Sequence, residues 1–433
     1  MTNRLWYRKL HWQILFAMVL GVAAGSIGGE AFAEKVGWMG TLFLSLLRMI
    51  IIPLVVSSII SGVASLGTGG GLARLFGKTF GYYLLSSLLA VLAGLLFVNL
   101  IQPGKGADFT GLQAATLPED LRTPSSVVEL ILDIVPQNVV SAMATGDMLA
   151  VIFFSILFGL TISTLPDESR LRLHGFFEAA FQAMMKLTGF ILLIAPIGVF
   201  ALMTRAIASF GLGAFKAMGL YMATVTVGLT VHLFLTLPIL LLLLARIRPW
   251  IHFRNMLEPL ALAFSTSSSA ATLPVTLSTV EKRVGVSNRV SSFVLPMGAT
   301  INMDGTALYE CAGVLFIAQA LGIELTITQQ AVVVLTALLA SIGAAAVPSA
   351  GLVIIFIVLE SVGLRGPQVD LLVGFMLAVD RPLDMYRTAV NVYSDSCGAA
   401  IIARSEGEMT VDAEVRTYDA SPAAGPTAPE NFD

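Results

Sequence analysis

Near the C-terminal end of the chain, residues 380–395 carry five charged side chains between long apolar segments. One guanidinium in this stretch, Arg387, follows a carboxylate, Asp384, by about one helical turn. An arginine can hold a carboxylate through two parallel hydrogen bonds, whereas an aspartate suits an ammonium group. The pair therefore predicts recognition of a small solute that carries both kinds of charge. If the stretch is helical, the following polar residues, here called the polar stripe, share one face within about 100°: Asp380, Asp384, Arg387, Thr388, Asn391 and Asp395.

The composition places this polar stripe in a membrane protein. The 433 residues are 56% hydrophobic and 12% charged, with a mean hydropathy of +0.85, whereas a soluble domain has about 25% charged residues. A charge at bilayer depth costs about 2.5–3.5 kcal/mol, so the stripe must be paired, hydrated or bound to a ligand. The net charge of −3 is too small to indicate a nucleic-acid partner. The two cysteines indicate neither a disulfide framework nor a metal site.

A second group of oxygen-bearing side chains suits small cations. Asn302 and Asp304 stand in a polar break within an apolar segment, and Asn391 and Asp395 belong to the polar stripe. Hard cations prefer such carboxylate and carbonyl oxygens, and Na⁺ is the obvious candidate in a membrane setting. We expect no organic cofactor.

Apolar segments that are long enough to cross a membrane recur along the chain, and they are too long for barrel strands. The sequence therefore predicts an all-α polytopic membrane protein with eight transmembrane helices plus two re-entrant helical hairpins. Basic residues cluster on alternate loops, which places both termini in the cytoplasm. The expected location is the inner membrane, with an uncleaved first span. The first six spans are expected at about 12–32, 38–66, 79–101, 130–163, 183–208 and 214–245.

Two later apolar segments are interrupted in their middles by small and polar residues. The first interruption, 265–274, has basic residues on both sides and predicts a hairpin that enters from the cytoplasm. The second, 341–351, should enter from outside. Each hairpin is followed by a span with a polar break, at 298–306 and at the polar stripe. Interrupted segments at corresponding places in two inverted repeats indicate a binding site at mid-membrane depth in a secondary transporter.

These features divide the chain into five regions. The last of them is polar and rich in proline and small residues, which is typical of disorder. The predicted regions are scaffold helices with the first two spans (1–77), the third span and an outer loop (78–129), spans four to six (130–254), a transport core with two hairpins and two broken helices (255–404), and a disordered cytoplasmic tail (405–433).

The motifs at these interruptions resemble those of the dicarboxylate/amino acid:cation symporter family, which contains the glutamate and aspartate transporters. The resemblance covers the chain except for its termini and the outer loop. The matching motifs are Ser267-Ser268-Ser269 with Thr272-Leu273-Pro274, then Asn302-Met303-Asp304-Gly305-Thr306, then Val347-Pro348, and finally Asp384 with Arg387-Thr388, Asn391 and Asp395.

The resemblance implies a substrate site for an acidic amino acid. In the family pattern, Asp384 would hold the amino group of the substrate and Arg387 its side-chain carboxylate. The remaining residues of the implied substrate site are Ser268, Ser269, Met303, Thr306, Val347, Gly351, Thr388 and Asn391.

The resemblance also implies three sodium sites and a homotrimer in the lipid bilayer. In each subunit, the part that carries the hairpins would move as an elevator against a fixed scaffold. The implied function is sodium-coupled import of aspartate or glutamate by a secondary active symporter. The first implied sodium site contains Gly298, Asn302, Asn391 and Asp395; the second, main-chain carbonyls of Thr300, Ser341, Ile342 and Ala344 beside Met303; the third, Tyr83, Ser86, Ser87, Asn302 and Asp304.

The chain departs from the family pattern at four positions. Ser267 and Met385 stand where some members carry arginine, and Ser86 and Ala344 stand where threonine is frequent. The alternative functions are a proton-coupled glutamate/aspartate symporter and a C4-dicarboxylate symporter. Other hypotheses are a charge network that only fixes helix packing, a channel, and an intramembrane serine hydrolase. None of the four histidines is expected to pair with a serine, which disfavours the hydrolase.

Overall fold

The computed structural model describes residues 10–64, 70–105, 135–211, 214–342, 350–408 and 411. Within these ranges all regular secondary structure is helical, and no strand occurs. The prediction of an all-α membrane protein is confirmed, whereas the predicted number of spans and hairpins stays a prediction. Four of the described helices are long and apolar enough to cross a membrane: Trp12–Ala64, Arg74–Ile101, Asp167–Leu193 and Phe215–Ala245.

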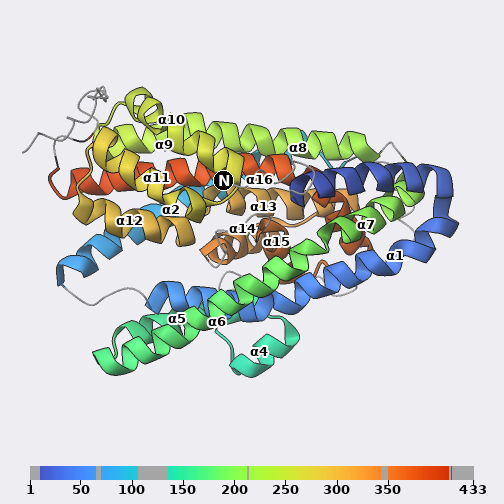
Figure 1. Ribbon diagram of the computed structural model, residues 1–433, viewed down its shortest axis with the longest axis horizontal. Coiled ribbons are helices and arrows are strands. Elements are labelled where there is room, and N and C mark those ends of the chain that lie inside the picture. Colours follow the sequence, from blue (N-terminus) through green and yellow to red (C-terminus); the bar gives the residue numbers. More distant parts are fainter. Residues whose placement is uncertain are drawn as a thin grey trace, which may run out of the picture.

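Helix α1 (Leu10–Ala64) contains the first two predicted spans. The predicted connection at 33–37 is helical, and the chain turns at Gly29 instead, with φ 56° and ψ −159°. Glycine adopts this conformation at little cost because it has no Cβ. The two arms of α1 therefore fold back from a corner (Figure 1). The third predicted span corresponds to α2 (Gly70–Ile101), and the outer loop falls largely outside the described residues.

The fourth predicted span is divided into two helices at 146–147, and the fifth begins earlier than predicted. The predicted fifth span starts at 183, but the helix begins at Asp167, so Arg170 and Arg172 lie on a helix and not in a loop. Asp167 pairs with Arg170 at 2.7 Å and Glu168 with Arg172 at 2.6 Å, which stabilises this first turn. The helices of this region are α4 (Val139–Thr145), α5 (Met148–Ser163), α6 (Asp167–Leu193) and α7 (Ala195–Phe210).

The sixth predicted span is a continuous helical segment that contains two π-helical turns. A π turn inserts one extra residue and is often found at functional sites, because it re-aims the side chains beside it. The first π turn begins at His232. The segments in order are α8 (Ala214–Val231), η2 (His232–Thr236), α9 (Leu237–Leu240) and η3 (Leu241–Ala245).

Both predicted hairpin segments contain two helices. In the first hairpin the chain turns at Ser267, with φ 51°, and the side chain of Ser268 caps the second helix. The connection of the second hairpin, 343–349, lies outside the described residues, and so do Ala344 and Val347. The helices are α10 (Pro249–Thr266), α11 (Ser269–Thr279) with η4 (Val280–Val284), and α14 (Ile327–Ile342) with α15 (Ala350–Ser361).

Of the two predicted broken helices, one is broken and the other is continuous. The chain leaves the helical conformation at Asn302 and Met303, between α12 (Asn288–Ile301) and α13 (Asp304–Ala320). In contrast, α16 (Pro367–Ser405) runs through the polar stripe without interruption. The prediction of a break there was wrong, because the charges of the stripe find partners one and two turns away on the same helix and need no unwound backbone.

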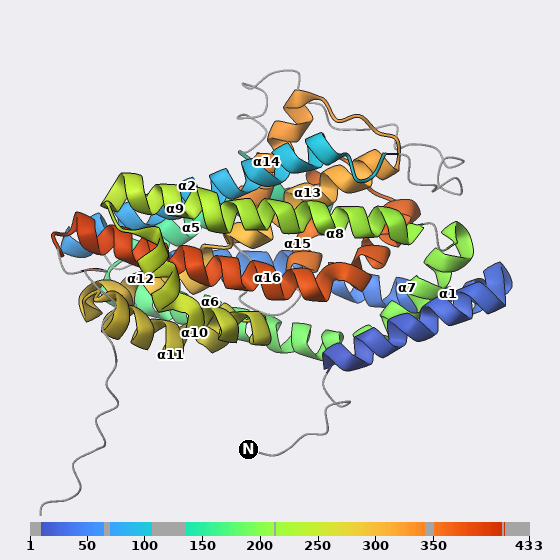
Figure 2. The ribbon, with the colours of Figure 1, turned by 90° about the horizontal axis from the view of Figure 1, so that it is seen from above.

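The helices pack in two groups. The scaffold group consists of α1, α4, α5, α6 and α7, in which α1 packs against α5, α6 and α7. The core group consists of α2, α8 and α10–α16 with the intervening turns, and its centre is formed by α13 and α16. Helices α8 and α16 lie side by side along the long axis of the molecule (Figure 2). The two groups meet where α16 contacts α7 and α1 and where α15 contacts α1.

Ion pairs fix the C-terminal end of α16 within the core group. The carboxylate of Glu406 is only 5% exposed and pairs with Lys78 at 2.6 Å, Arg74 at 2.9 Å and Arg289 at 3.1 Å. The hydrogen bond from Lys78, with a further one from Arg74, lowers the pKa of Glu406 below its ordinary value. Because Lys78 and Arg74 belong to α2 and Arg289 to α12, this carboxylate ties three helices together.

Candidate substrate and cation site

The guanidinium of Arg387 lies at the centre of the polar stripe and is 1% exposed. Its Nε and Nη2 atoms donate to Oδ1 of Asp384 at 3.1 and 2.9 Å. Nη2 also donates to Oδ1 of Asp380 at 3.1 Å. Asp384 and Asp380 precede Arg387 by three and seven residues, so a continuous helix brings all three to one face. The structure therefore shows the single face that the sequence predicts, with two carboxylates compensated by one guanidinium.

Two other helices of the core group enclose this guanidinium. Cζ of Arg387 lies 4.2 Å from the centroid of the Tyr309 ring on α13, a cation–π contact. On α15, the main chain of Gly351 comes so close that an added Cβ would lie 2.8 Å from Nη1 of Arg387. Nη1 has no hydrogen-bond partner within the described residues. One donor edge of Arg387 thus faces the second hairpin and has no acceptor among the residues that the structure describes.

Further predicted substrate residues gather where the break at 302–303 passes into α13. The side-chain oxygen of Asn391 accepts a hydrogen bond from the main chain of Gly305 at 2.7 Å. The amide nitrogen of Asn391 lies 3.4 Å from Oγ1 of Thr306 and 3.4 Å from the sulfur of Met303. On α16 itself, Thr388 donates to the carbonyl of Asp384 at 2.7 Å. The broken and the continuous helix therefore bring these predicted residues together.

The tip of the first hairpin offers serine hydroxyls. Ser268 accepts a hydrogen bond from the main-chain nitrogen of Ala271 at 3.2 Å, and Ser269 is buried in the first turn of α11. The buried hydroxyl of Ser267 has no hydrogen-bond partner in the described part of the chain. Because α10 and α11 both pack against α16, the hairpin with Ser268 and Ser269 lies on the helix that carries Arg387. Val347, predicted at the other tip, lies outside the described residues.

The residues of the first implied sodium site surround the break before α13. The amide nitrogen of Asn302 donates to Oδ1 of Asp395 at 2.9 Å. An added Cβ at Gly298 would lie 2.5 Å both from this oxygen and from the hydroxyl of Tyr83, so only a glycine leaves these oxygens room. Gly298, Asn302 and Asp395 thus lie together, and Asn391 stands one turn earlier than Asp395 on α16.

The residues of the third implied sodium site form a second buried cluster around Asp304. Ser87 donates to Oδ1 of Asp304 at 2.5 Å, and Ser86 lies 3.3 Å from the same oxygen and 3.4 Å from the side-chain oxygen of Asn302. Nε2 of His232 lies 2.9 Å from the other carboxylate oxygen of Asp304. The hydroxyl of Tyr83 donates to the carbonyl of Val294 at 2.8 Å. Helices α2, α12 and α13 therefore meet at an oxygen-rich centre.

For the second implied sodium site the structure describes only some of the implied residues. Thr300 donates to the carbonyl of Met297 at 2.9 Å, and Ser341 to the carbonyl of Leu338 at 2.8 Å. Ser341 and Ile342 are the last two residues of α14, which contacts α12. Ala344 lies outside the described residues. This part of the site stays a prediction.

The sequence analysis missed three residues that lie at the site. Tyr309 stacks on Arg387, His232 contacts Asp304, and both carboxylate oxygens of Glu310 are buried with no hydrogen-bond partner among the residues that the structure describes. Glu310 could have been identified from the sequence, since an acidic residue within an apolar span is by default a functional candidate. No sequence pattern could have paired His232 with Asp304, because 72 residues separate them in the sequence.

A histidine does pair with a serine, contrary to the expectation. Nε2 of His252 lies 3.0 Å from Oγ of Ser396 in the buried contact between α10 and α16. The hydroxyl of Ser396 donates to the carbonyl of Tyr393 at 2.7 Å, so its proton is directed at the main chain. This pair links the first hairpin to α16, and a separation of 144 residues hid it from sequence analysis.

The charges buried around the two clusters do not balance. Among the described residues, the buried Arg387 and the partly exposed Arg381, which pairs with Asp384 at 3.3 Å, accompany five buried carboxyl groups, so three negative charges remain in excess if all of the carboxyl groups are ionised. Such an excess in a low-dielectric interior must be neutralised by cations or protons. The five carboxyl groups, all at most 3% exposed, belong to Asp304, Glu310, Asp380, Asp384 and Asp395.

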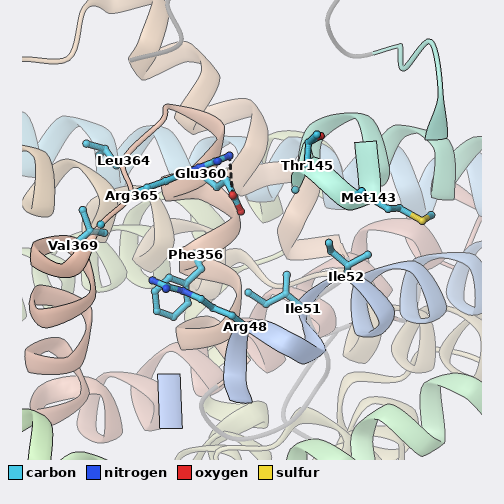
Figure 3. Close-up of a pocket in the computed structure, with 13 residues that line it drawn as sticks. Arg48, Ile51, Ile52, Met143, Thr145, Phe356, Glu360, Leu364, Arg365 and Val369 are labelled. Carbon is cyan, nitrogen blue, oxygen red and sulfur yellow. Dashed lines mark ion pairs between the residues drawn. The ribbon is translucent and has the colours of Figure 1, made fainter. Parts of the chain in front are cut away.

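A cavity of about 330 Å³ lies apart from the polar stripe, between the scaffold group and the core group. Arg48 on α1 forms an ion pair with Asp370 on α16, and its Cζ lies 4.7 Å from the centroid of the Phe356 ring on α15. A second ion pair belongs to the core group: Nη2 of Arg365 lies 2.8 Å from Oε1 of Glu360 (Figure 3). The Arg48–Asp370 pair therefore joins the two helix groups beside this cavity.

Comparison with known proteins gives consistent matches along almost the whole chain. Residues 10–405 match the family model of the sodium:dicarboxylate symporter family. The chain is 36% identical to a proton/glutamate-aspartate symporter of Escherichia coli (strain K12), over 92% of this chain and 93% of the relative. It is 35% identical to a proton/sodium-glutamate symport protein of Bacillus caldotenax, over 92% and 95%. It is 33% identical to a C4-dicarboxylate transport protein of Bacillus subtilis (strain 168), over 93% and 95%.

Proposed function

Since the chain belongs to the sodium:dicarboxylate symporter family, we propose that it is a secondary active symporter that imports aspartate or glutamate together with sodium across the inner membrane. Members of this family are transporters and not enzymes, and the apolar helices support a membrane-spanning protein. The observation that carries the proposal is the excess of buried carboxyl groups around the buried guanidinium of Arg387 within the described part of the chain. A site with this charge balance is stabilised when cations enter with an anionic substrate.

Substrate binding uses two charged groups of opposite sign within the polar stripe, Arg387 and Asp384. The side-chain carboxylate of the substrate binds Arg387, whose Nη1 has no partner within the described residues and faces Gly351 on the second hairpin. The substrate ammonium group binds Asp384, which exchanges part of its contact with Arg387 for the new cation. Thr306, Thr388 and Asn391 supply the uncharged hydrogen-bonding groups. The serines at the tip of the first hairpin and Val347 at the second complete the site.

Sodium binds in the oxygen clusters next to the substrate. Asp304 with Ser86, Ser87 and Asn302 provides carboxylate, hydroxyl and amide oxygens within hydrogen-bonding reach of one another, which suits a hard cation. Asp395 and Asn302 provide a second set beside Gly298. Because Asn302 takes part in both clusters and the break at 302–303 also contacts Asn391, cation binding orders the same segment that contacts the substrate.

The transport movement is an elevator-type displacement of the core group against the scaffold group, within a homotrimer. In support, both hairpins, the broken helix and the polar stripe belong to one packed group, and α1, α5, α6 and α7 form the other. The cavity beside the Arg48–Asp370 pair shows that packing between the groups is incomplete on this side. A core that carries the whole site can move without breaking the contacts of Arg387.

Glu310 favours a second candidate, in which protons replace some or all of the sodium ions. Its carboxyl group is fully buried on α13 with no hydrogen-bond partner within the described ranges. A carboxyl group in this environment is far more stable neutral than ionised, so it can carry a proton through the transport cycle. The names of two relatives include protons as the coupling ion, one of them together with sodium.

Uptake of radiolabelled aspartate and glutamate into proteoliposomes tests these proposals. We expect accumulation with an inward Na⁺ gradient and none when Na⁺ is absent on both sides. Accumulation without Na⁺ but with an inward H⁺ gradient would transfer the coupling role to protons, and Glu310→Gln should then abolish it. Uptake of succinate without uptake of either amino acid would favour a C4-dicarboxylate symporter. Uptake of aspartate that follows its own gradient under all ion conditions would overturn the symport proposal.

A further inference from the structure

A tyrosine of α8 packs against the tyrosine that contacts Arg387. Helix α8 runs beside α16 (Figure 2) and also packs against α13. On this helix Tyr221 is 0% exposed, and its ring centroid lies 6.2 Å from that of Tyr309 and 4.8 Å from that of Phe316. The centroid of Tyr309 lies in turn 4.2 Å from Cζ of Arg387. Aromatic rings from two helices therefore form a continuous series of contacts that ends at the guanidinium.

The sequence of α13 leaves room for Tyr221. Tyr309, Gly313 and Phe316 are spaced four and three residues apart, so they share one face of this helix. An added Cβ at Gly313 would lie 2.6 Å from Cδ1 of Ile355 and 3.2 Å from the hydroxyl oxygen of Tyr221. Because Gly313 has no side chain, Tyr221 can pack on α13 between the two rings. The ring of Tyr221 is thus held against Tyr309 by the shape of this face.

The position of the Tyr309 ring matters for the guanidinium of Arg387. A guanidinium is planar, and a cation–π contact places it over the face of a ring, so the ring restricts the orientation of the guanidinium. Nε and Nη2 donate to Asp384, whereas Nη1 faces Gly351 and has no acceptor among the described residues. A carboxylate that accepts two parallel hydrogen bonds from Arg387 requires one orientation of these donors. A displaced Tyr309 ring would therefore weaken binding without removing a charge.

We propose that Tyr221 is a positioning residue for substrate binding: it holds the ring of Tyr309, and Tyr309 orients the guanidinium of Arg387 toward the substrate carboxylate. Tyr221 acts through Tyr309 and makes no contact of its own with the substrate. Its ring provides this effect, because its buried hydroxyl has no hydrogen-bond partner within the described part of the chain. The inference rests on the proposed function and adds to it a residue of α8, a helix that carries none of the binding motifs.

A purely structural role of Tyr221 makes a different prediction. Replacing a buried aromatic residue by a smaller one leaves a cavity and lowers the stability of the fold. In that case the amount of folded protein and the total uptake would fall, but the protein that remains folded would bind aspartate as before. The apparent KM for aspartate, measured together with the maximal rate per folded protein, is therefore the diagnostic quantity.

The test measures uptake of radiolabelled aspartate by the full-length protein in proteoliposomes. Leucine fills much of the same space but offers no flat ring to Tyr309. In Tyr221→Leu we expect the apparent KM to rise about tenfold, as a small displacement of the guanidinium should cause, with the maximal rate per folded protein within about twofold of the unmodified protein. Tyr221→Phe should retain the original KM because the ring remains.

The matched control removes another buried ring from the contact between α8 and α16. Phe375 on α16 is 0% exposed, and its ring centroid lies 5.2 Å from that of Phe215 on α8. It precedes Arg387 by 12 residues, which is about 18 Å along the helix. Phe375→Leu should therefore lower stability and leave the KM for aspartate unchanged.

The results separate this inference from the proposed function. An unchanged KM in Tyr221→Leu, with aspartate uptake retained, would overturn the inference alone, and so would an equal rise of KM in Phe375→Leu or in Tyr221→Phe. Absence of aspartate uptake in the unmodified protein would overturn the proposed function and the inference with it. If Tyr221→Leu transports too slowly, the aspartate concentration that half-maximally stabilises the purified protein against heat gives the same comparison, and an unchanged concentration would overturn the inference.

Discussion

Replacing Arg387 by cysteine removes the buried guanidinium that contacts Asp380 and Asp384. The variant loses three hydrogen bonds, of 2.9, 3.1 and 3.1 Å, together with the cation–π contact with Tyr309 at 4.2 Å. It also leaves two carboxylates, at most 5% exposed, without this partner. The change therefore acts on substrate binding and on stability at once, and the two effects have different magnitudes.

For binding, the relevant quantity is the free energy of the two charge-assisted hydrogen bonds between Arg387 and the substrate carboxylate. Each contributes about 1.5–3 kcal/mol, so the loss of both lowers aspartate affinity by roughly 10²–10⁴-fold. For stability, removal of one partner of a buried ion pair costs about 3–5 kcal/mol. Part of this cost should disappear in the double variant Asp380→Asn with Arg387→Cys, since one unpaired charge is then removed. The control Arg283→Cys breaks a partly exposed pair and should cost about 0–1 kcal/mol.

The assay combines thermal unfolding in detergent with uptake into proteoliposomes. Arg387→Cys should lose aspartate uptake and gain uptake of a neutral amino acid such as serine, because the remaining groups still recognise the amino-acid end of the substrate. It should unfold at a lower temperature than the double variant. Unchanged aspartate affinity in Arg387→Cys would refute the role given to the guanidinium, and equal stability of the single and double variants would refute the charge argument.

Three further predictions follow from the same contacts. Asp384→Asn should remove the preference for an ammonium group, so that succinate and aspartate compete about equally in an uptake assay. Gly351→Ala should place a Cβ about 2.8 Å from Nη1 of Arg387 and raise the apparent KM for aspartate about tenfold by displacing the guanidinium; an unchanged KM would contradict the packing of α15. Because the pKa of Glu406 is lowered in the folded protein, its stabilisation should be present above its unfolded pKa of about 4.3 and be lost as the pH falls through the folded value. The difference in unfolding temperature between the unmodified protein and Glu406→Gln should therefore be present at pH 7 and shrink below about pH 4.

The sequence by itself determined the features that depend on local composition and periodicity. The apolar segments specify membrane helices, and the spacing within 380–395 places Asp384, Arg387 and Asn391 on one face. The turn at Ser267 and the break at 302–303 were predictable from small and polar residues inside apolar runs. These features follow from a few neighbouring residues, because helical geometry relates positions only one or two turns apart.

The tertiary structure decided which groups satisfy the buried charges. His232 meets Asp304 across 72 residues, and Glu310 is buried without a hydrogen-bond partner in the described part of the chain. It also decided that α16 is continuous, because Arg387 is compensated within the helix by Asp380 and Asp384. Nothing in a local pattern specifies a partner that another helix supplies, since the energy of a buried charge depends on every group packed around it.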